Sequence, residues 1–179
     1  MRFLVTLCLA LFAATAAAQD WEALEEPGAF AIMRHALAPG TGDPAEFEIG
    51  RCETQRNLDD RGRAQAREIG AAFRERGITF DAVWTSEWCR CAETADLLDL
   101  GAVERVPALN SFFGNRARGP EQTRETLELI DARGGRPMLV THQVNITALT
   151  GEFPRSGEVF VVRRAGNRLD VIGKILISP

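Results

Sequence analysis

The two histidines of this 179-residue chain each stand at the end of a short apolar run that is typical of a buried β-strand. His35 ends the run 29–35, and His142 ends the run 137–142. In an open α/β sheet, ligands bind at the carboxyl ends of the strands, where backbone amides and helix N-termini converge. We therefore expect the two imidazoles to meet in one pocket.

Two arginines stand near these positions. Arg34 directly precedes His35, and Arg90 lies in the segment 86–95, after a predicted strand at 81–85. A guanidinium offers a planar fork of donors that matches phosphate, and a neutral imidazole can act as a nucleophile. The combination suits phosphoryl transfer, in which positioning and charge neutralisation dominate. The alternatives are a purely structural histidine and an arginine that pairs with a surface glutamate.

Apolar periodicity and turn residues predict strands that alternate with helices. The expected strands cover 29–34, 81–85, 102–106 and 137–141, the expected helices cover 60–76, 87–98, 121–132 and 144–149, and a closing hairpin covers 158–163 and 169–177. Asp59 or Asp60 is expected to cap the first helix and Ser86 the second. The alternation predicts an α/β protein, a single-domain three-layer α/β/α sandwich with a mostly parallel central sheet.

The first 18 residues have the pattern of a secretory signal peptide. Arg2 supplies a positive charge, residues 3–12 are almost entirely apolar, and 16–18 is an Ala-Ala-Ala cleavage site. The apolar stretch is too short for a membrane span. We therefore expect residues 1–18 to be removed and residues 19–179 to form one periplasmic or secreted domain.

The overall charge narrows the class of partner. The formal net charge is −4, whereas a sequence-independent nucleic-acid binder is normally basic. We therefore expect no nucleic-acid partner. The sequence makes no prediction of the oligomeric state.

Three cysteines lie outside the predicted signal peptide: Cys52, Cys89 and Cys91. Export to an oxidising compartment permits a disulfide, and neighbours in a Cys-x-Cys pair are poorly placed to bridge each other. Cys52 is therefore expected to pair with Cys89 or with Cys91. The alternative, a three-cysteine zinc site, is disfavoured because Cys-x-Cys is not a typical structural zinc spacing.

Four ordered motifs between 29 and 151 together resemble those of the histidine phosphatase superfamily, which includes phosphoglycerate mutases and phosphohistidine phosphatases. They are Arg34-His35-Ala36, the stretch from Asn57-Leu58 through Gly62 to Gln65-Ala66, the stretch from Ser86 to Ala95, and Thr141-His142. The resemblance, to the phosphoglycerate mutase-like branch 1, implies that His35 attacks phosphorus and becomes a phosphohistidine. It also implies that Arg34, Arg90 and His142 hold the phosphoryl oxygens, and that no metal or cofactor is needed.

A finer resemblance points to a periplasmic subgroup that includes the lipopolysaccharide core heptose phosphate phosphatases. It rests on the stretches 52–58, 88–91 and 142–146. It implies a small phosphorylated substrate or phosphosugar, with Arg56, Asn57 and Asn145 as substrate-binding residues. The neighbouring Arg51 is instead expected to pair on the surface with Glu48 or Glu53.

The chain departs from the family pattern at the residue after the nucleophile and at both usual positions of a general acid. Ala36 replaces glycine and suggests a slightly different turn, and Ser111 and Gln143 stand where family members carry an acid. The change fits a substrate with a good leaving group. It also fits an acid supplied from elsewhere, for which the sequence offers three glutamates, Glu53, Glu121 and Glu158.

Two functions follow from these residues. The first is an exported phosphomonoester or phosphoryl hydrolase that acts through phospho-His35. The second is a non-catalytic phosphate- or phosphosugar-binding module whose site has lost its acid. The two histidines and two arginines favour the hydrolase. The absence of an acid at Ser111 and Gln143 favours the binding module.

Overall fold

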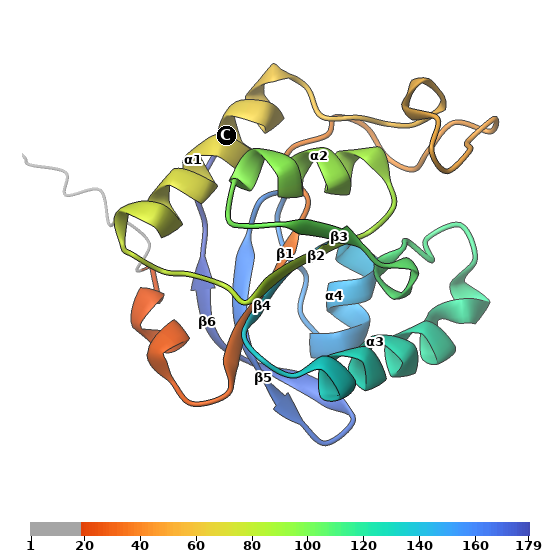
Figure 1. Cartoon of the computed structure of the whole chain (residues 1–179). Helices are drawn as coiled ribbons and strands as arrows, with labels where there is room; N and C mark the ends of the chain where they lie inside the picture. Colours follow the sequence, from red (N-terminus) through yellow and green to blue (C-terminus); the bar gives the residue numbers. More distant parts are fainter. Residues whose placement is uncertain (1–18) are drawn as a thin grey trace, which may run out of the picture.

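The computed structural model describes residues 19–179 and has a six-stranded mixed sheet in the order β3-β2-β4-β1-β5-β6 (Figure 1). The strands are β1 (Ala29–Arg34), β2 (Ala82–Thr85), β3 (Val103–Arg105), β4 (Pro137–Thr141), β5 (Val159–Ala165) and β6 (Arg168–Ile175). The helices are α1 (Asp60–Glu75), α2 (Cys89–Leu98), α3 (Gly119–Arg133) and α4 (Gln143–Thr150), with short 3-10 turns at η1 (Trp21–Glu25), η2 (Cys52–Thr54), η3 (Pro107–Leu109) and η4 (Arg116–Arg118). The predicted signal peptide lies outside the described residues. Within them, no helix combines the length and the apolar character needed to cross a membrane.

The mostly parallel α/β sheet expected from the sequence is confirmed. Strands β3, β2, β4 and β1 run parallel to one another, and the hairpin β5–β6 adds to the edge beside β1 with antiparallel pairing. Strand β1 is aligned with β4 so that Arg34 lies opposite Thr141. A histidine directly follows the last residue of each strand. This register therefore places His35 and His142 side by side at the carboxyl ends of β1 and β4.

Side chains of the central strands alternate between two apolar layers, which is the pattern of a sheet buried on both faces. In β1, Ala31 and Met33 pack into one cluster, whereas Phe30 and Ile32 pack into the other. Figure 1 shows α1 and α2 on one side of the strands and α3 and α4 on the other. The helices of each side supply the apolar partners: Ile69, Phe73, Ala95 and Leu98 on the first, and Leu127, Ile130, Ile146 and Leu149 on the second.

The prediction that Ser86 caps α2 is wrong. The helix begins at Cys89, with Trp88 in the cap position and no side-chain capping bond. The Ser86 hydroxyl is instead 2.9 Å from Nε2 of His142 and accepts a bond from the backbone N–H of Trp88. A tertiary contact has therefore replaced the local cap. The prediction for α1 is confirmed, since the Asp59 carboxylate accepts the N–H of Gly62.

Helix α1 fixes the segment that follows His35. A Cβ on Gly62 would lie 1.9 Å from the carbonyl oxygen of Leu37, so only glycine permits this close approach. Gln65 is fully buried, and its side-chain oxygen accepts the N–H of Leu37 while its amide donates to the carbonyls of Ser156 and Ile177. The helix is thereby bonded to the turn after the first histidine and to the chain beside it.

A disulfide joins Cys52 to Cys89, which is one of the two expected pairings. It closes a sequence separation of 37 residues and attaches the long loop after β1 to the first residue of α2, next to Arg90. Cys91 is a free, buried thiol. Two of the three thiols are thus unavailable as zinc ligands.

Reduction of this disulfide is expected to lower the free energy of unfolding by about 2–4 kcal/mol, because it releases a long constrained loop in the unfolded chain. Thermal unfolding with and without a reductant measures the change. A Cys52→Ser, Cys89→Ser double variant is the control, since its melting temperature should not respond to the reductant. A non-reduced digest that yields no peptide pair linked through Cys52 and Cys89 would contradict the assignment.

Candidate active site

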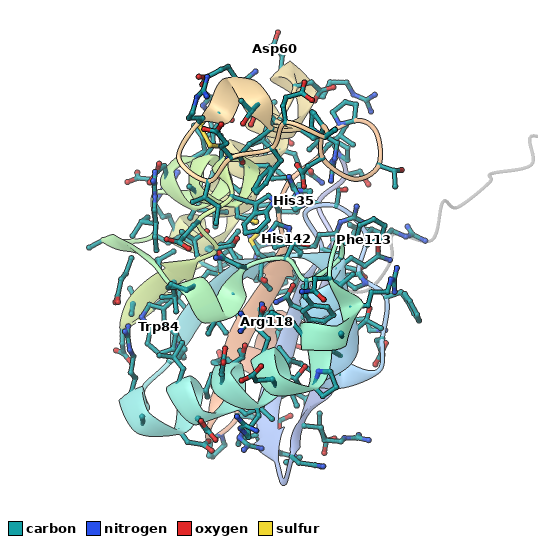
Figure 2. The ribbon with its side chains drawn as sticks, turned by 90° about the vertical axis from the view of Figure 1, so that its right-hand side faces the viewer. His35, Asp60, Trp84, Phe113, Arg118 and His142 are labelled. Atoms are coloured by element: carbon teal, nitrogen blue, oxygen red, sulfur yellow. A yellow bond between two sulfur atoms is a disulfide. The ribbon has the colours of Figure 1, made fainter. Side chains whose placement is uncertain are left out.

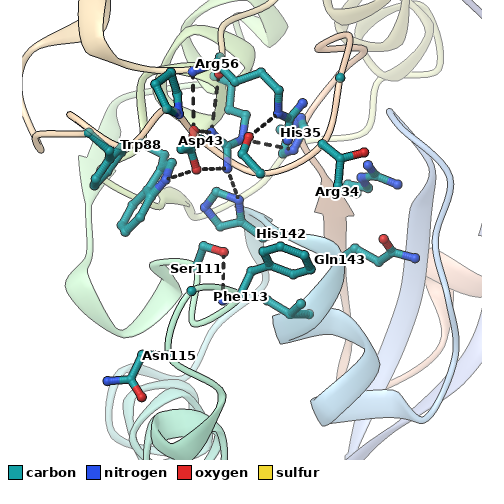
Figure 3. A pocket seen from close by; sticks show the side chains of 18 residues that line it. Arg34, His35, Asp43, Arg56, Trp88, Ser111, Phe113, Asn115, His142 and Gln143 are labelled. Atoms are coloured by element: carbon teal, nitrogen blue, oxygen red, sulfur yellow. Dashed lines mark hydrogen bonds and ion pairs between the residues drawn. The ribbon is translucent and has the colours of Figure 1, made fainter.

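A cavity of about 580 Å³ opens at the carboxyl ends of β1 and β4. Its polar lining includes both histidines, three arginines and one carboxylate, namely His35, His142, Arg34, Arg56, Arg90 and Asp43. Figure 2 shows the two histidines next to each other at one end of the sheet, and Figure 3 shows the lining from close by. The expected meeting of the imidazoles is therefore observed, with 5.6 Å between the ring centroids.

His35 is held as a neutral imidazole, with a hydrogen-bond partner at each ring nitrogen. Its side chain is buried, and Nδ1 lies 2.7 Å from the carbonyl oxygen of Ala36, so Nδ1 carries the proton and donates it. Nε2 is then the unprotonated nitrogen, and it accepts the Nε–H of Arg90 at 3.2 Å. Burial, and next the charge of Arg90, lowers the pKa of His35 well below its usual value. Nε2 therefore carries no proton at neutral pH, and its lone pair is bonded to Arg90.

His142 is bonded at both ring nitrogens. Nε2 is 2.9 Å from the Ser86 hydroxyl, which bonds onward to the side-chain oxygen of Asn110. Nδ1 faces Nη2 of Arg90 at 3.4 Å. Burial, followed by the charge of Arg90, also lowers the pKa of His142 well below its usual value. The buried thiol of Cys91 packs against this ring, and burial raises the pKa of that thiol to about 12.

Arg90 connects the two histidines, and all five of its N–H groups have partners. The side chain is 3% exposed. Its bonds go to Nε2 of His35, Nδ1 of His142, both carboxylate oxygens of Asp43 and the carbonyl oxygen of Arg56. Arg90 is thus buried between the two histidines, and among the described residues its ion pair is with Asp43 rather than with a surface glutamate.

Asp43 is a residue of the cavity that the sequence did not predict. Its carboxylate accepts bonds from Arg90 at 2.6 and 3.1 Å, from Nε1 of Trp88 and from the backbone N–H of Arg56. Burial raises the pKa of this carboxyl, but the hydrogen bonds and charge of Arg90 outweigh burial and leave the pKa below its usual value. Among the described residues that line the cavity, Asp43 carries the one carboxylate.

The other two arginines of the cavity make its charge positive. Arg34 donates to the carbonyl oxygen of Pro154, but its Nε–H is buried without a hydrogen-bond partner among the described residues. Arg56 donates to the carbonyl oxygen of Gly42 and so holds the loop that carries Asp43. Burial, and next the charge of Arg90, lowers the pKa of both Arg34 and Arg56. Three guanidinium groups around one carboxylate suit a bound anion.

Two of the expected substrate-binding residues do not line the cavity. Asn57 donates to the backbone carbonyls of Cys52 and Gln55. Asn145 is buried and donates to the carbonyl of Asn110, whose side chain bonds to Ser86 below His142. Both asparagines therefore support the loops of the site, whereas Arg56 lines the cavity as expected.

Of the positions considered for a general acid, some line the cavity and others lie outside it. Ser111 and Gln143 line the cavity, and the Ser111 hydroxyl accepts the backbone N–H of Phe113. None of the three candidate glutamates, Glu53, Glu121 and Glu158, lines the cavity. Glu53 instead pairs with Arg51 on the surface, which confirms the expected pairing of Arg51. Ala36 does not adopt the left-handed conformation that would require glycine.

Because the folded chain keeps both imidazoles neutral, we expect neither to titrate near pH 6.5. In the unfolded chain both histidines take up protons as the pH falls below 6.5. The free energy of unfolding therefore decreases below pH 6.5, by up to about 1.4 kcal/mol for each pH unit and for each histidine. The chain has two histidines, so long-range ¹⁵N–¹H spectra resolve each ring and report its tautomer. A Nε2-protonated His35, or ring shifts that titrate at pH 6.5, would contradict the expectation.

Comparison with known proteins agrees with this geometry. The sequence model of the histidine phosphatase superfamily (branch 1) matches residues 30–126. A mitochondrial serine/threonine-protein phosphatase, Pgam5 of Drosophila grimshawi, is 41% identical over 52 residues, which are 29% of this chain and 18% of that protein. The chain therefore matches less than a fifth of this relative's length.

Solved structures share the fold at low sequence identity. The protein histidine phosphatase SixA in complex with tungstate superposes with a TM-score of 0.56 at 16% identity, covering 82% of this chain and 96% of SixA. The α-ribazole phosphatase of Shigella flexneri superposes with a TM-score of 0.56 at 14% identity, covering 84% of this chain and 100% of that phosphatase. The match of the family model to residues 30–126, which contain His35 and Arg90, shows that the chain belongs to branch 1 of the histidine phosphatase superfamily.

Proposed function

We propose that this protein hydrolyses phosphorylated substrates through a phosphohistidine formed on Nε2 of His35. The observation that carries the proposal is the buried contact between this lone pair and Arg90, in a cavity with three guanidinium groups and one carboxylate. Such a cavity attracts a phosphoryl dianion and holds a nucleophile beside it. The family membership supports the same activity.

In the proposed first step, phosphoryl oxygens take the Nε–H and the inner Nη2–H of Arg90, which the two imidazole nitrogens accept in the free protein. Arg34 and Arg56, which also line the cavity, add positive charge around these oxygens. The lone pair of His35 forms a bond to phosphorus, and the bonding pair of the leaving group departs with its oxygen or nitrogen. The dianion favours the protonated form of His142, which can then donate through Nδ1.

In the second step, water attacks the phosphorus of phospho-His35. The P–N bond breaks, its electron pair returns to Nε2, and the proton of water passes to solvent or to the released phosphate. The bond from Nδ1 to the Ala36 carbonyl keeps the same tautomer ready for the next cycle.

The lining favours substrates whose leaving group departs without protonation. Ser111 and Gln143 offer no acid, and Asp43 is held ionised by Arg90. A general acid typically contributes 10²–10⁴-fold, and alkyl phosphates need it most. We therefore propose a phosphohistidine, an acyl phosphate or a pyrophosphate as the substrate class, with the core heptose phosphates suggested by the finer resemblance as the alternative.

We also propose that the protein is exported. The disulfide between Cys52 and Cys89 supports this, because such bonds persist in oxidising compartments. The signal-peptide pattern of residues 1–18 is the second support.

The test compares phosphate release from a phosphohistidine donor, p-nitrophenyl phosphate and an alkyl phosphate, together with rapid quenching in alkali to trap the phosphoenzyme. We expect turnover in that order of rate and a label that maps to His35. The degenerate acid positions favour a second function, a binding module. Tight vanadate binding without turnover of any donor would select that function and reject the hydrolase.

A further inference from the structure

The guanidinium of Arg90 presents two forks of donors, and the protein uses them differently. The fork of Nε–H and one Nη2–H faces the unprotonated nitrogens of His35 and His142, at 3.2 and 3.4 Å. The fork at the tip of the group, from Nη1 and Nη2, is occupied by the two carboxylate oxygens of Asp43. Figure 3 shows the carboxylate of Asp43 above the imidazole of His142.

We propose that Asp43 is the positioning residue of Arg90: it occupies the outer fork and thereby turns the inner fork toward the place where the phosphoryl group reacts. The inference rests on the proposed hydrolase function and names the residue that organises its site. A guanidinium on a flexible side chain has several orientations, and a bidentate carboxylate selects one of them. The remaining Nη1–H, bonded to the carbonyl of Arg56, fixes the same orientation.

The position of Asp43 is itself determined from two sides. Its Oδ2 accepts the indole N–H of Trp88 at 3.1 Å, and that indole stacks on Phe47 with 4.7 Å between the ring centroids. Its Oδ1 accepts the backbone N–H of Arg56, whose side chain in turn holds the carbonyl of Gly42. A carboxylate with these supports acts as a fixed reference for Arg90.

The same contacts argue against Asp43 as the missing general acid. Each of its two oxygens already accepts two donors, one from Arg90 and one from Trp88 or Arg56. A proton on either oxygen would place a donor against these N–H groups. The carboxylate is therefore built to accept, and its effect reaches the substrate through Arg90.

The experiment compares Asp43→Asn and Asp43→Glu with the wild type on a series of aryl and alkyl phosphates and in vanadate binding. A lost orientation of Arg90 affects every substrate alike, so we expect Asp43→Asn to lower kcat/KM by about 10²-fold across the series and to weaken vanadate in parallel. Asp43→Glu retains the charge and should recover part of both. Glu48→Gln is the matched control, since it removes an exposed partner of Arg51 in the same loop.

Three results would overturn the inference. A loss confined to poor leaving groups, with vanadate binding unchanged, would make Asp43 a general acid. Tighter vanadate binding in Asp43→Asn would show that Asp43 competes with the anion for Arg90. If the Asp43→Asn, Arg90→Ala double variant loses as much kcat/KM as the two single losses combined, Asp43 does not act through Arg90. Circular dichroism and melting temperature establish that each variant is folded. If the wild type turns over no donor, the proposed function fails, and the vanadate comparison still decides the role of Asp43.

Discussion

Replacing His35 with asparagine is expected to lower kcat by about 10⁴-fold or more while the protein stays folded and binds vanadate. The asparagine amide can take the place of Nδ1 and keep the hydrogen bond to the carbonyl of Ala36, but the variant has no atom at the position of Nε2. Loss of a nucleophile removes the covalent route itself, and effects of this order follow. Steady-state turnover and rapid-quench labelling measure the loss.

Ser111→Ala is the matched control for this variant. Ser111 lines the same cavity, but its hydroxyl bonds to the backbone of Phe113 and to neither histidine. We expect its kcat to stay close to that of the wild type. If His35→Asn keeps wild-type turnover, or if the label remains on the protein, the nucleophile is another group.

Replacing Arg90 with alanine is expected to lower kcat/KM by about 10³-fold or more and also to move the pH profile. A positioned arginine in phosphoryl transfer has effects of this size. The charge of Arg90 is the second cause, after burial, that lowers the pKa of both histidines. Its removal raises these pKa values, so protonation inactivates the nucleophile at a higher pH, and the acid limb of kcat/KM moves upward.

The variant Arg90→Lys distinguishes the effect of the positive charge from the effect of the paired guanidinium donors. Lysine keeps a positive charge but offers no planar pair of donors. We expect it to leave the acid limb nearer its original place while kcat/KM remains low. An unshifted acid limb in both variants would contradict the proposed electrostatic coupling between Arg90 and the imidazoles.

Arg90→Ala should also destabilise the fold, because it leaves the carboxylate of Asp43 without its ion pair in a mostly buried place. Breaking a buried pair costs about 3–5 kcal/mol, and the 18% exposure of Asp43 reduces this figure. A double variant that also changes Asp43→Ala should recover stability but not activity. Thermal unfolding and kinetics on the same samples test both statements.

The sequence was sufficient for the parts of the site that regular structure places. The apolar runs that end at His35 and His142 predicted two strands, and parallel neighbours present their ends at one edge of a sheet. The bounds of β1 and β4 match the prediction, and the register between them accounts for the meeting of the imidazoles.

The parts that the sequence did not predict depend on contacts between distant segments. Asp43 lies in a loop rich in glycine and proline, and only the folded loop reveals that its carboxylate reaches Arg90, which is 47 residues away in the chain. The hydroxyl of Ser86 has the chemistry of a helix cap but bonds to His142. Asn145 fits a substrate-binding pattern, yet its amide donates to the carbonyl of the distant Asn110. Asn57 is the exception, because its amide donates to backbone carbonyls of its own segment.

The full occupancy of the Arg90 donors favours charged ligands over neutral ones. A ligand that enters must replace the bonds that this guanidinium already makes to the two imidazole nitrogens. A neutral hydroxyl or carbonyl offers an acceptor no stronger than imidazole and gains nothing by the exchange. An anionic oxygen offers a charge-assisted bond about twice as strong, so an anion is able to displace the nitrogens. In the proposed reaction, a phosphoryl group that does so releases the lone pair of His35 from Arg90.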